Sequence, residues 1–341
     1  MKVVVVEQFG GVDQLQVREL PTPEPGPGQV RVRLTSIGLN HAELMARRGE
    51  YRLVSGDPPF TPGLEGGGII DAIGPDIDPD RLGQRIILSP DATRRGAGLG
   101  GSYRSHFIVP ADKAMPAPDA IPDDQLGAIW MPYLTAWGCL VWQQQLGPGQ
   151  IIALTAASSS VALAAAQIAR HRGATTIGLT RSAQKAKAIQ QLDTAAYDHL
   201  LTTHEPDGKM KPWHRDLRQL LDDRGVDVFF DPIAAGEYLQ SEIYSLAPHG
   251  CIWVYGLLGK PGTVDVTPLI RKHAAIRGWS LTELIEAGEA VWQPGCQHIF
   301  EGFAQGIYRQ HLGGSFKLDD VQHAHHVMER GEHLGKLVLI P

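Results

Sequence analysis

The chain has 341 residues, of which 43% are hydrophobic and 20% are charged, a composition that supports packed cores and argues against disorder. The length suggests two domains of ordinary size. The net charge of −6 and the lack of a long basic run argue against nucleic acid as a main partner.

Neither a membrane span nor a secretory signal is expected. The apolar run at residues 3–6 is too short for a signal-peptide core and predicts a first strand. Residues 151–169 contain serine, threonine, glutamine and many alanines, so they predict a strand, a turn and a helix. The cysteines Cys139, Cys251 and Cys296 lie far apart, which favours three buried thiols in a reducing compartment, here the cytoplasm.

The first 120 residues predict a compact β-rich domain. They are rich in glycine and proline, and short alternating segments at 31–35 and 105–109 are typical of strands. Residues 63–70 predict a tight turn that leads into another strand.

From about residue 122, apolar strands alternate with helices, which is typical of a parallel sheet covered on both faces. After an apolar helix at 126–146, strands are expected at 151–155, 175–179, 199–202, 226–230 and 251–255, and helices at 160–172, 182–192, 213–224 and 236–246. A closing strand at 336–340 is expected to rejoin the first domain. The predicted domains are therefore 1–122 with 273–341, and 123–272.

The turn after the first strand of this sheet predicts a dinucleotide site. Every residue from 156 to 160 is small, so the backbone can approach a pyrophosphate at the start of the next helix. The usual glycines are absent, but Ser158, Ser159 and Ser160 keep their N–H groups and a serine can cap the helix before Val161. The alternative is an ordinary capped turn.

A second glycine-rich stretch, at 96–101, matches G-x-G-x-x-G literally. It follows Arg94-Arg95 and leads into a strand-like segment, whereas the fingerprint requires a strand before it and a helix after it. We therefore predict a flexible loop there.

The end of the second strand favours NADPH over NADH. An acidic residue would bind the ribose hydroxyls of NADH, but none follows this strand. Thr180 and Ser182 supply hydroxyls and Arg181 and Lys185 supply positive charge, a set that suits a 2′-phosphate. The alternative is a solvated loop and first helical turn.

Several segments, taken in order, resemble the zinc-independent quinone oxidoreductase branch of the medium-chain dehydrogenase/reductase superfamily. They are Gly38-Leu39-Asn40, Arg48-Gly49-Glu50-Tyr51, the glycine-rich 62–68, Leu134-Thr135-Ala136, the turn and helix at 158–167, and 182–186. The resemblance implies an α/β protein with a GroES-like domain and a doubly wound Rossmann domain, and NADPH-dependent reduction of quinones or α,β-unsaturated carbonyl compounds.

The resemblance also implies roles for single residues. Asn40 would lie near the nicotinamide ribose and Tyr51 would line the substrate side. Contacts to the cofactor would come from Thr135, Ser158, Ser159, Ser160, Val161, Thr180, Arg181, Lys185, Gly256, Leu257, Trp279 and Ser280. A tyrosine that many relatives place near the position of Leu200 is missing here.

No metal site is expected. Zinc-using relatives place a cysteine in the segment that matches 36–40 and a histidine before the glutamate that matches Glu65, but here no cysteine lies in that segment and Leu64 precedes Glu65. A group of histidines at 323, 325, 326 and 333 is more typical of a solvated helix face.

Direct hydride transfer is the expected mechanism, with Tyr51 as a candidate hydrogen-bond donor to the substrate oxygen or as a packed aromatic. Asn40 would position the cofactor. Two alternatives stay open, an NADPH-binding sensor with little turnover and a zinc-free alcohol dehydrogenase. A homodimer that pairs through the fifth strand and residues 263–267 is expected from the resemblance.

Overall fold

The computed structural model describes residues 1–52, 56–93 and 100–341, so most of the glycine-rich stretch 96–101 lies outside the described residues. The chain divides into two compact units. The first unit contains residues 1–131, 296–306 and 310–341, and the second contains 132–295 and 307–309.

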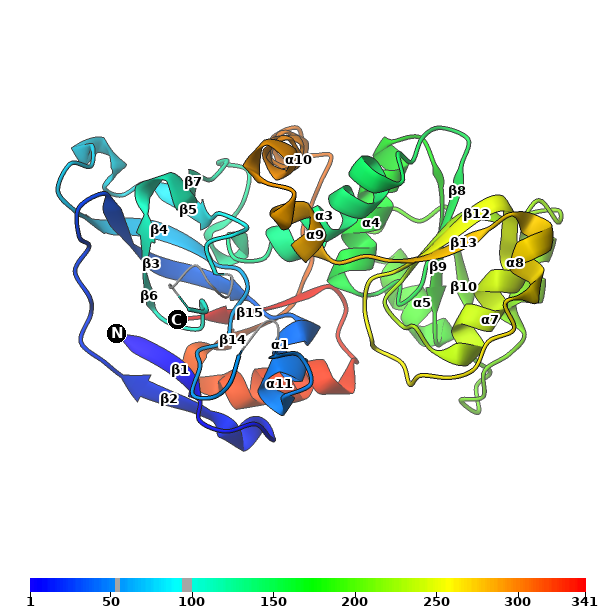
Figure 1. Cartoon of the computed structure of the whole chain (residues 1–341), viewed down its shortest axis with the longest axis horizontal. Helices are drawn as coiled ribbons and strands as arrows, with labels where there is room; N and C mark the ends of the chain where they lie inside the picture. The colour runs from blue at the N-terminus through cyan, green and yellow to red at the C-terminus, as the bar shows by residue number, and fades with distance from the viewer. Residues whose placement is uncertain (53–55, 94–99) are drawn as a thin grey trace. The chain divides into compact units, whose positions relative to one another are not determined.

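The first unit is built on mostly antiparallel strands, with β14 and β15 paired in parallel. A seven-stranded sheet has the order β14-β15-β3-β4-β5-β7, with β6 also paired to β3, and β1 pairs with β2 (Figure 1). The strands are β1 (Lys2–Val6), β2 (Leu15–Glu19), β3 (Gln29–Gly38), β4 (Gly67–Ile73), β5 (Arg85–Leu88), β6 (His106–Pro110), β7 (Ala114–Pro116), β14 (Leu312–Lys317) and β15 (Lys336–Ile340).

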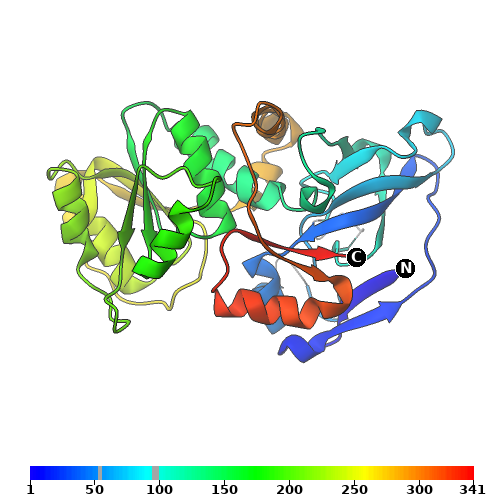
Figure 2. The same cartoon turned by 180° about the vertical axis from the view of Figure 1, so that it is seen from behind.

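Two helices, α1 (His41–Arg48) and α11 (Val321–Arg330), lie side by side in this unit (Figures 1 and 2). Alternate residues of β3 and β6, among them Val30, Val32 and Phe107, face a core shared with β15 and α11. The C-terminal strand thus completes the first unit's sheet, because β15 pairs with Ile37 and Gly38 at the end of β3.

The second unit is a six-stranded parallel sheet with the order β10-β9-β8-β11-β12-β13. Its strands are β8 (Ile151–Leu154), β9 (Thr175–Thr180), β10 (His199–Thr202), β11 (Val226–Asp231), β12 (Leu246–Val254) and β13 (Ala275–Gly278). Its helices are α4 (Ser160–His171), α5 (Ala183–Gln190), α6 (Trp213–Leu220), α7 (Gly236–Ser245), α8 (Thr267–Lys272) and α9 (Leu281–Glu286). Helices α4 and α5 cover one face, and α6 and α7 cover the other (Figures 1 and 2).

Two helices pass from one unit to the other along the chain. They are α3 (Trp130–Trp137), which continues as a π-helix at Gly138–Gln143, and α10 (Glu289–Ala304). The predicted helix at 126–146 is therefore shorter at both ends. Residues 126–129 stay outside it, where the Gly127 N–H donates to the Ser36 hydroxyl over 2.7 Å.

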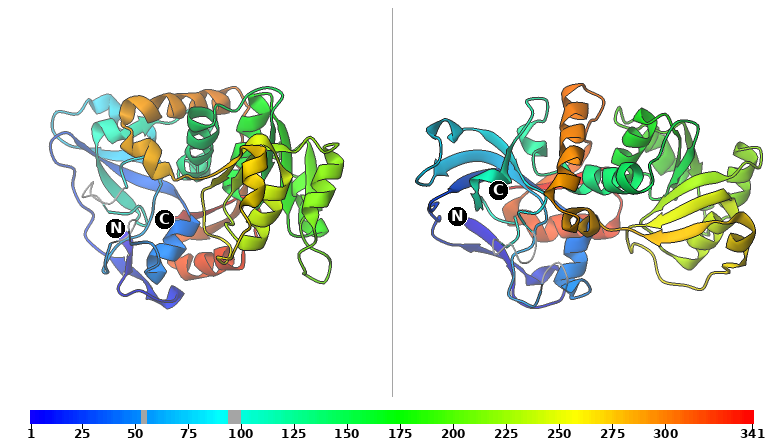
Figure 3. Two further views of the ribbon diagram at one scale, coloured as in Figure 1. Left: turned by 45° about the vertical axis from the view of Figure 1, so that its right-hand side comes forward. Right: turned by 45° about the horizontal axis from the view of Figure 1, so that its top comes forward.

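Three further expectations differ from the structure. Residues 123–131, predicted in the second domain, belong to the first unit. Residues 273–295 belong to the second unit, because β13 adds a sixth strand to its sheet (Figure 3). For the same reason β12, the predicted fifth strand, is no sheet edge: it lies between β11 and β13. The open edge on this side is β13.

Candidate active site

The turn after β8 holds the predicted pyrophosphate residues. Ser159 is the N-cap of α4: its hydroxyl accepts a hydrogen bond from the Ala162 N–H over 3.2 Å. Ser158 is buried, and Ser160 and Val161 are half-buried. The first N–H groups of a helix have no acceptor within it, so Ser160 and Val161 present donors at the positive end of α4. This arrangement fits a bound pyrophosphate.

Ala156 takes the left-handed conformation in this turn, with φ of 48°. For a residue with a Cβ that conformation costs about 1 kcal/mol. Two contacts hold the next residue: the Ala157 N–H donates to the Leu179 carbonyl over 3.1 Å, and the Tyr197 hydroxyl donates to the Ala157 carbonyl over 2.7 Å. Sequence reasoning missed Tyr197, because a tyrosine in a loop before β10 carries no signal of this role.

Asp231 links the ends of β8 and β11 through hydrogen bonds. Its carboxylate accepts hydrogen bonds from the Thr155 hydroxyl over 2.5 Å and from the N–H groups of Ile233 and Ala234 over 2.8 Å each. Burial raises the pKa of Asp231, and these three donors lower it. The loop after β11 is therefore fixed against the predicted pyrophosphate turn.

The Tyr255 hydroxyl is an unsatisfied polar atom beside this turn. Its ring stacks on Phe230 with centroids 3.9 Å apart. Burial and the charge of Asp231 raise the pKa of Tyr255, and Ser159 lowers it. Within the described residues the hydroxyl is buried and has no well-formed hydrogen bond. A polar ligand on the turn would supply the missing partner.

The end of β9 brings the predicted 2′-phosphate residues together. Ser182 caps α5, because its hydroxyl accepts a hydrogen bond from the Lys185 N–H over 3.2 Å. Thr180 is buried, Arg181 is exposed, and Lys185 is half-buried in the first turn of α5. The segment combines two cationic side chains, a capping hydroxyl and the positive end of a helix.

The segment after β12 runs beside the loop after β11. The N–H groups of Leu258 and Gly259 donate to the carbonyls of Pro232 and Ile233, over 2.8 and 2.7 Å. A Cβ at Gly256 would lie 2.9 Å from Pro232 atoms, so this close approach requires glycine. Leu257 is 62% exposed.

Trp279 packs inside the second unit. Its indole N–H donates to the Thr135 carbonyl over 2.9 Å, and its backbone N–H donates to Val254 over 2.8 Å. Trp279 is 5% exposed, whereas Ser280 is exposed. The structure thus brings Thr135 and Trp279 together, but the Trp279 donors are already engaged.

Asn40 belongs to a buried polar network in the first unit. The Lys336 ammonium donates to Glu65 over 2.5 Å and to the Asn40 side-chain oxygen over 2.6 Å. The Asn40 amide nitrogen in turn lies 3.2 Å from Glu65. The side chains of Lys336 and Glu65 are each 1% exposed. A Cβ at Gly38 would lie 2.5 Å from the Glu65 carboxylate and 2.7 Å from Lys336, so the network requires glycine there.

A second chain of hydrogen bonds adjoins the first. The Tyr103 hydroxyl donates to Glu43 over 2.8 Å, so it accepts from His325 Nε2 over 3.1 Å. Burial raises the pKa of Glu43 to about 7, while its hydrogen-bond donors and Lys336 lower it. Burial, and then the charge of Arg47, lower the pKa of His325 to about 3. His325 is therefore a neutral, buried residue, not part of a solvated helix face.

The network fixes the start of α1, which leads to Tyr51. Asn40 is the N-cap residue, and its N–H donates to Glu43 over 2.7 Å. The helix ends at Gly49, whose φ of 80° is left-handed, and half-buried Tyr51 follows. The polar atoms of the Asn40 side chain all face protein groups. Asn40 thus anchors the helix that precedes Tyr51.

The residues around Glu65 do not fit zinc. No cysteine lies in residues 36–40, Leu64 rather than a histidine precedes Glu65, and the Lys336 ammonium donates to the Glu65 carboxylate. Within residues 1–52, 56–93 and 100–341, no group of three or more His, Cys, Asp or Glu side chains could hold a metal ion.

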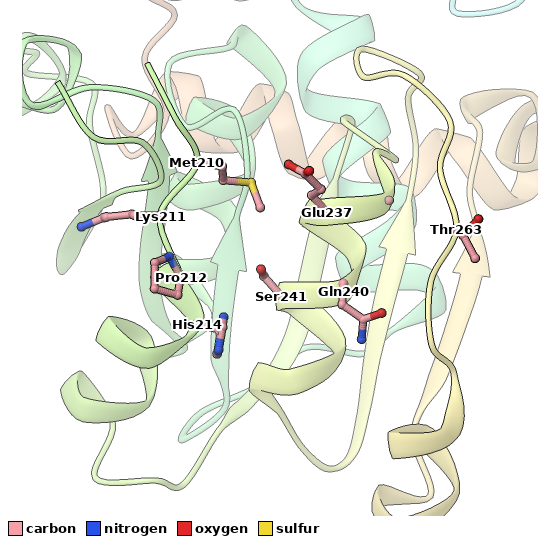
Figure 4. Close-up of a pocket in the computed structure, with 9 residues that line it drawn as sticks. Met210, Lys211, Pro212, His214, Glu237, Gln240, Ser241 and Thr263 are labelled. Atoms are coloured by element: carbon pink, nitrogen blue, oxygen red, sulfur yellow. The ribbon is translucent and has the colours of Figure 1, made fainter. Parts of the chain in front are cut away.

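A pocket of about 470 Å³ lies between the starts of α6 and α7 (Figure 4). Met210 and Glu237 face each other at one end, and Ser241 points into the space from α7 (Figure 4). None of the residues predicted to bind the cofactor lines this pocket. Met210, which lines the pocket, forms an isolated β-bridge with His204.

Two family models match the chain. Residues 26–119 match the alcohol dehydrogenase GroES-like domain, and residues 160–294 match the model described as zinc-binding dehydrogenase. Together they cover about two thirds of the chain. With the two sheets, these matches confirm the predicted GroES-like and Rossmann fold class. In the part of the chain that the structure describes, no helix has the length and apolar composition needed to cross a membrane.

Curated relatives match over almost the whole chain. The human synaptic vesicle membrane protein VAT-1 homolog is 27% identical, over 100% of this chain and 86% of the relative. The 2-haloacrylate reductase of Burkholderia sp is 26% identical, over 99% and 98%. Human quinone oxidoreductase is 25% identical, over 100% and 98%. The crystal structure of Escherichia coli quinone oxidoreductase complexed with NADPH superposes with a TM-score of 0.84 at 24% identity, covering 100% of both chains, and shows the shared fold.

The Lys336–Glu65 pair predicts a large stability effect. Lys336→Met should leave a buried carboxylate unpaired and lower the free energy of unfolding by about 3–5 kcal/mol, measured by urea denaturation. The double variant Lys336→Met/Glu65→Gln should recover most of this loss. Lys317→Met on exposed β14 is the matched control. Equal unfolding midpoints for Lys336→Met and the control would contradict the role of the pair.

Proposed function

The chain belongs to the medium-chain dehydrogenase/reductase superfamily, and on this premise we propose that it is an NADPH-dependent, zinc-free oxidoreductase that reduces quinones or α,β-unsaturated carbonyl compounds. The observation that carries the cofactor assignment is the end of β9, because residues 180–185 include Arg181 and Lys185 at the capped start of α5 and contain no aspartate or glutamate. The names of two relatives, a quinone oxidoreductase and a 2-haloacrylate reductase, support the substrate class.

We assign the cofactor contacts as follows. The N–H groups of Ser160 and Val161, with Ser158 and Ser159, would hold the pyrophosphate, and Thr180, Arg181 and Lys185 would hold the 2′-phosphate. Backbone groups at Thr135, Gly256, Leu257, Trp279 and Ser280 would line the nicotinamide end. The chemistry that NADPH supplies when bound is hydride donation to an electron-poor carbon or a quinone.

The protein's own part is orientation and charge stabilisation. When an enone or quinone is reduced, negative charge develops on its oxygen, and a hydrogen-bond donor stabilises that charge. We propose Tyr51 as the donor. Asn40 would position α1, and through it Tyr51, because its side chain is held by Lys336 and Glu65.

We further infer a cytoplasmic homodimer. Cys139, Cys251 and Cys296 are all buried and outside any disulfide, as expected in a reducing compartment. The edge strand β13 offers unpaired backbone groups, and Val266 and Ile270, in the neighbouring segment that includes α8, are 54% and 76% exposed. These features support pairing of two copies at β13.

The phosphate assignment predicts a selective loss of affinity. The double variant Arg181→Ala/Lys185→Ala should weaken NADPH binding by about 100-fold or more, because two charge-assisted contacts are removed, and should leave NADH binding nearly unchanged. Lys187→Ala, an exposed lysine on the same helix, is the control. Fluorescence titration measures both affinities. Equal losses for the two nucleotides would refute the assignment.

The catalytic assignment predicts that Tyr51→Phe lowers kcat by about 100-fold with little change in KM, because the donor acts mainly in the transition state. Turnover is followed as loss of NADPH absorbance across a panel of quinones, enones and alcohols. The exposed Tyr244→Phe is the control. Tight NADPH binding without consumption would favour the sensor alternative, and alcohol oxidation with NADP would favour the dehydrogenase alternative.

The dimer inference predicts a solution mass twice that of the 37.0 kDa chain by light scattering. Ile270→Asp should shift the protein to a monomer, because a charge would be buried at the interface, without lowering the free energy of unfolding of the chain. A monomeric unsubstituted protein would contradict the inference.

A further inference from the structure

His204 lies beside the proposed 2′-phosphate residues. Strands β9 and β10 are parallel, with Thr202 opposite Thr180. The pairing continues beyond β10, because the Thr203 N–H donates to the Thr180 carbonyl over 2.8 Å. Neighbouring strands are about 4.8 Å apart. His204 therefore lies next to Arg181 and the capped start of α5.

Three hydrogen-bond contacts meet at the Thr203 hydroxyl. It lies 3.2 Å from the Thr180 carbonyl, 2.7 Å from the Tyr238 hydroxyl and 2.9 Å from His204 Nδ1. When its single proton is donated to the Thr180 carbonyl, the other two contacts are accepted by the Thr203 oxygen. In this arrangement neutral His204 carries its proton on Nδ1, and Nε2 is an acceptor.

The surroundings of His204 favour its neutral form. Burial and then the charge of Arg181 lower the pKa of His204, and Glu237 on α7 raises it. Another titratable group nearby is Tyr238, whose ring centroid lies 6.1 Å from that of the imidazole. A lone pair on Nε2 cannot donate to an anion, but a protonated Nε2 can.

We propose that His204 is a third cationic contact of the cofactor's 2′-phosphate and takes up a proton when the phosphorylated dinucleotide binds. The inference rests on the proposed NADPH site. The proton comes from solvent, adds to Nε2, and the new N–H donates to a phosphate oxygen, while no covalent bond to the ligand forms. The dianionic phosphate supplies the negative charge that outweighs the repulsion from Arg181.

Proton uptake is measured directly by titration calorimetry of the intact protein in buffers of different ionisation enthalpy. Near pH 7.5 the phosphate, with a pKa of about 6, is already ionised and contributes little. We expect an uptake approaching one proton per NADPH and none per NADH. The affinity for NADPH should rise as pH falls from 8.5 towards 7, by up to about tenfold per pH unit, with no matching change for NADH.

His204→Gln tests the residue itself. It should abolish the proton uptake, flatten the pH dependence and weaken NADPH binding about tenfold at pH 7, with NADH binding unchanged. The exposed His199→Gln, at the other end of β10, is the matched control. Because the uptake is measured on the unsubstituted protein, a variant that fails to fold does not remove the test.

The outcomes separate the two proposals. Equal affinities for NADPH and NADH in the unsubstituted protein would overturn the NADPH assignment. A retained preference for NADPH without proton uptake, or uptake that persists in His204→Gln, would overturn the role of His204 alone. The expected pattern supports both.

Discussion

Parallel pairing of β8, β9, β11 and β12 is the constraint on which the candidate cofactor site depends. Parallel strands bring all the following turns to one edge of the sheet. Hydrogen bonds continue this pairing past the strands: Thr155 binds Asp231, Thr203 binds Thr180, and Tyr255 N–H binds the Asp231 carbonyl. The loops that would contact the dinucleotide are thus extensions of the sheet. This support explains how a turn without glycines can hold a fixed shape.

The alternation of strands and helices could be predicted because strands buried on both faces, such as Ile151–Leu154, are continuously apolar. The apolar pattern does not predict β13, because its sequence Ala-Ile-Arg-Gly is short and partly exposed. The predicted domain boundary at residue 273 therefore lies before the last strand of the sheet. Tyr197 illustrates a second limit, because a loop side chain that supports a turn has no periodic signature.

The buried hydrogen-bond network of the first unit could not be predicted from the sequence, because its partners lie far apart along the chain. Motifs singled out Asn40 and Glu65, but Lys336 lies 271 residues after Glu65, in a strand where a lysine is normally taken for a surface residue. Likewise Tyr103 and His325 are 222 residues apart. Burial of such groups is acceptable only when they are paired, and the pairing depends on the three-dimensional path of the chain.

The pairing of Lys336 also bears on how a substrate oxygen could be polarised. The Lys336 ammonium is buried, and its hydrogen bonds go to Glu65 and Asn40. The Tyr103 hydroxyl is likewise committed to Glu43. On the proposed function, charge on the substrate oxygen would be stabilised by a hydrogen-bond donor outside this network. Tyr51 is half-buried and follows the helix that the network anchors, so in this proposal the buried charges would act by fixing the position of a neutral donor.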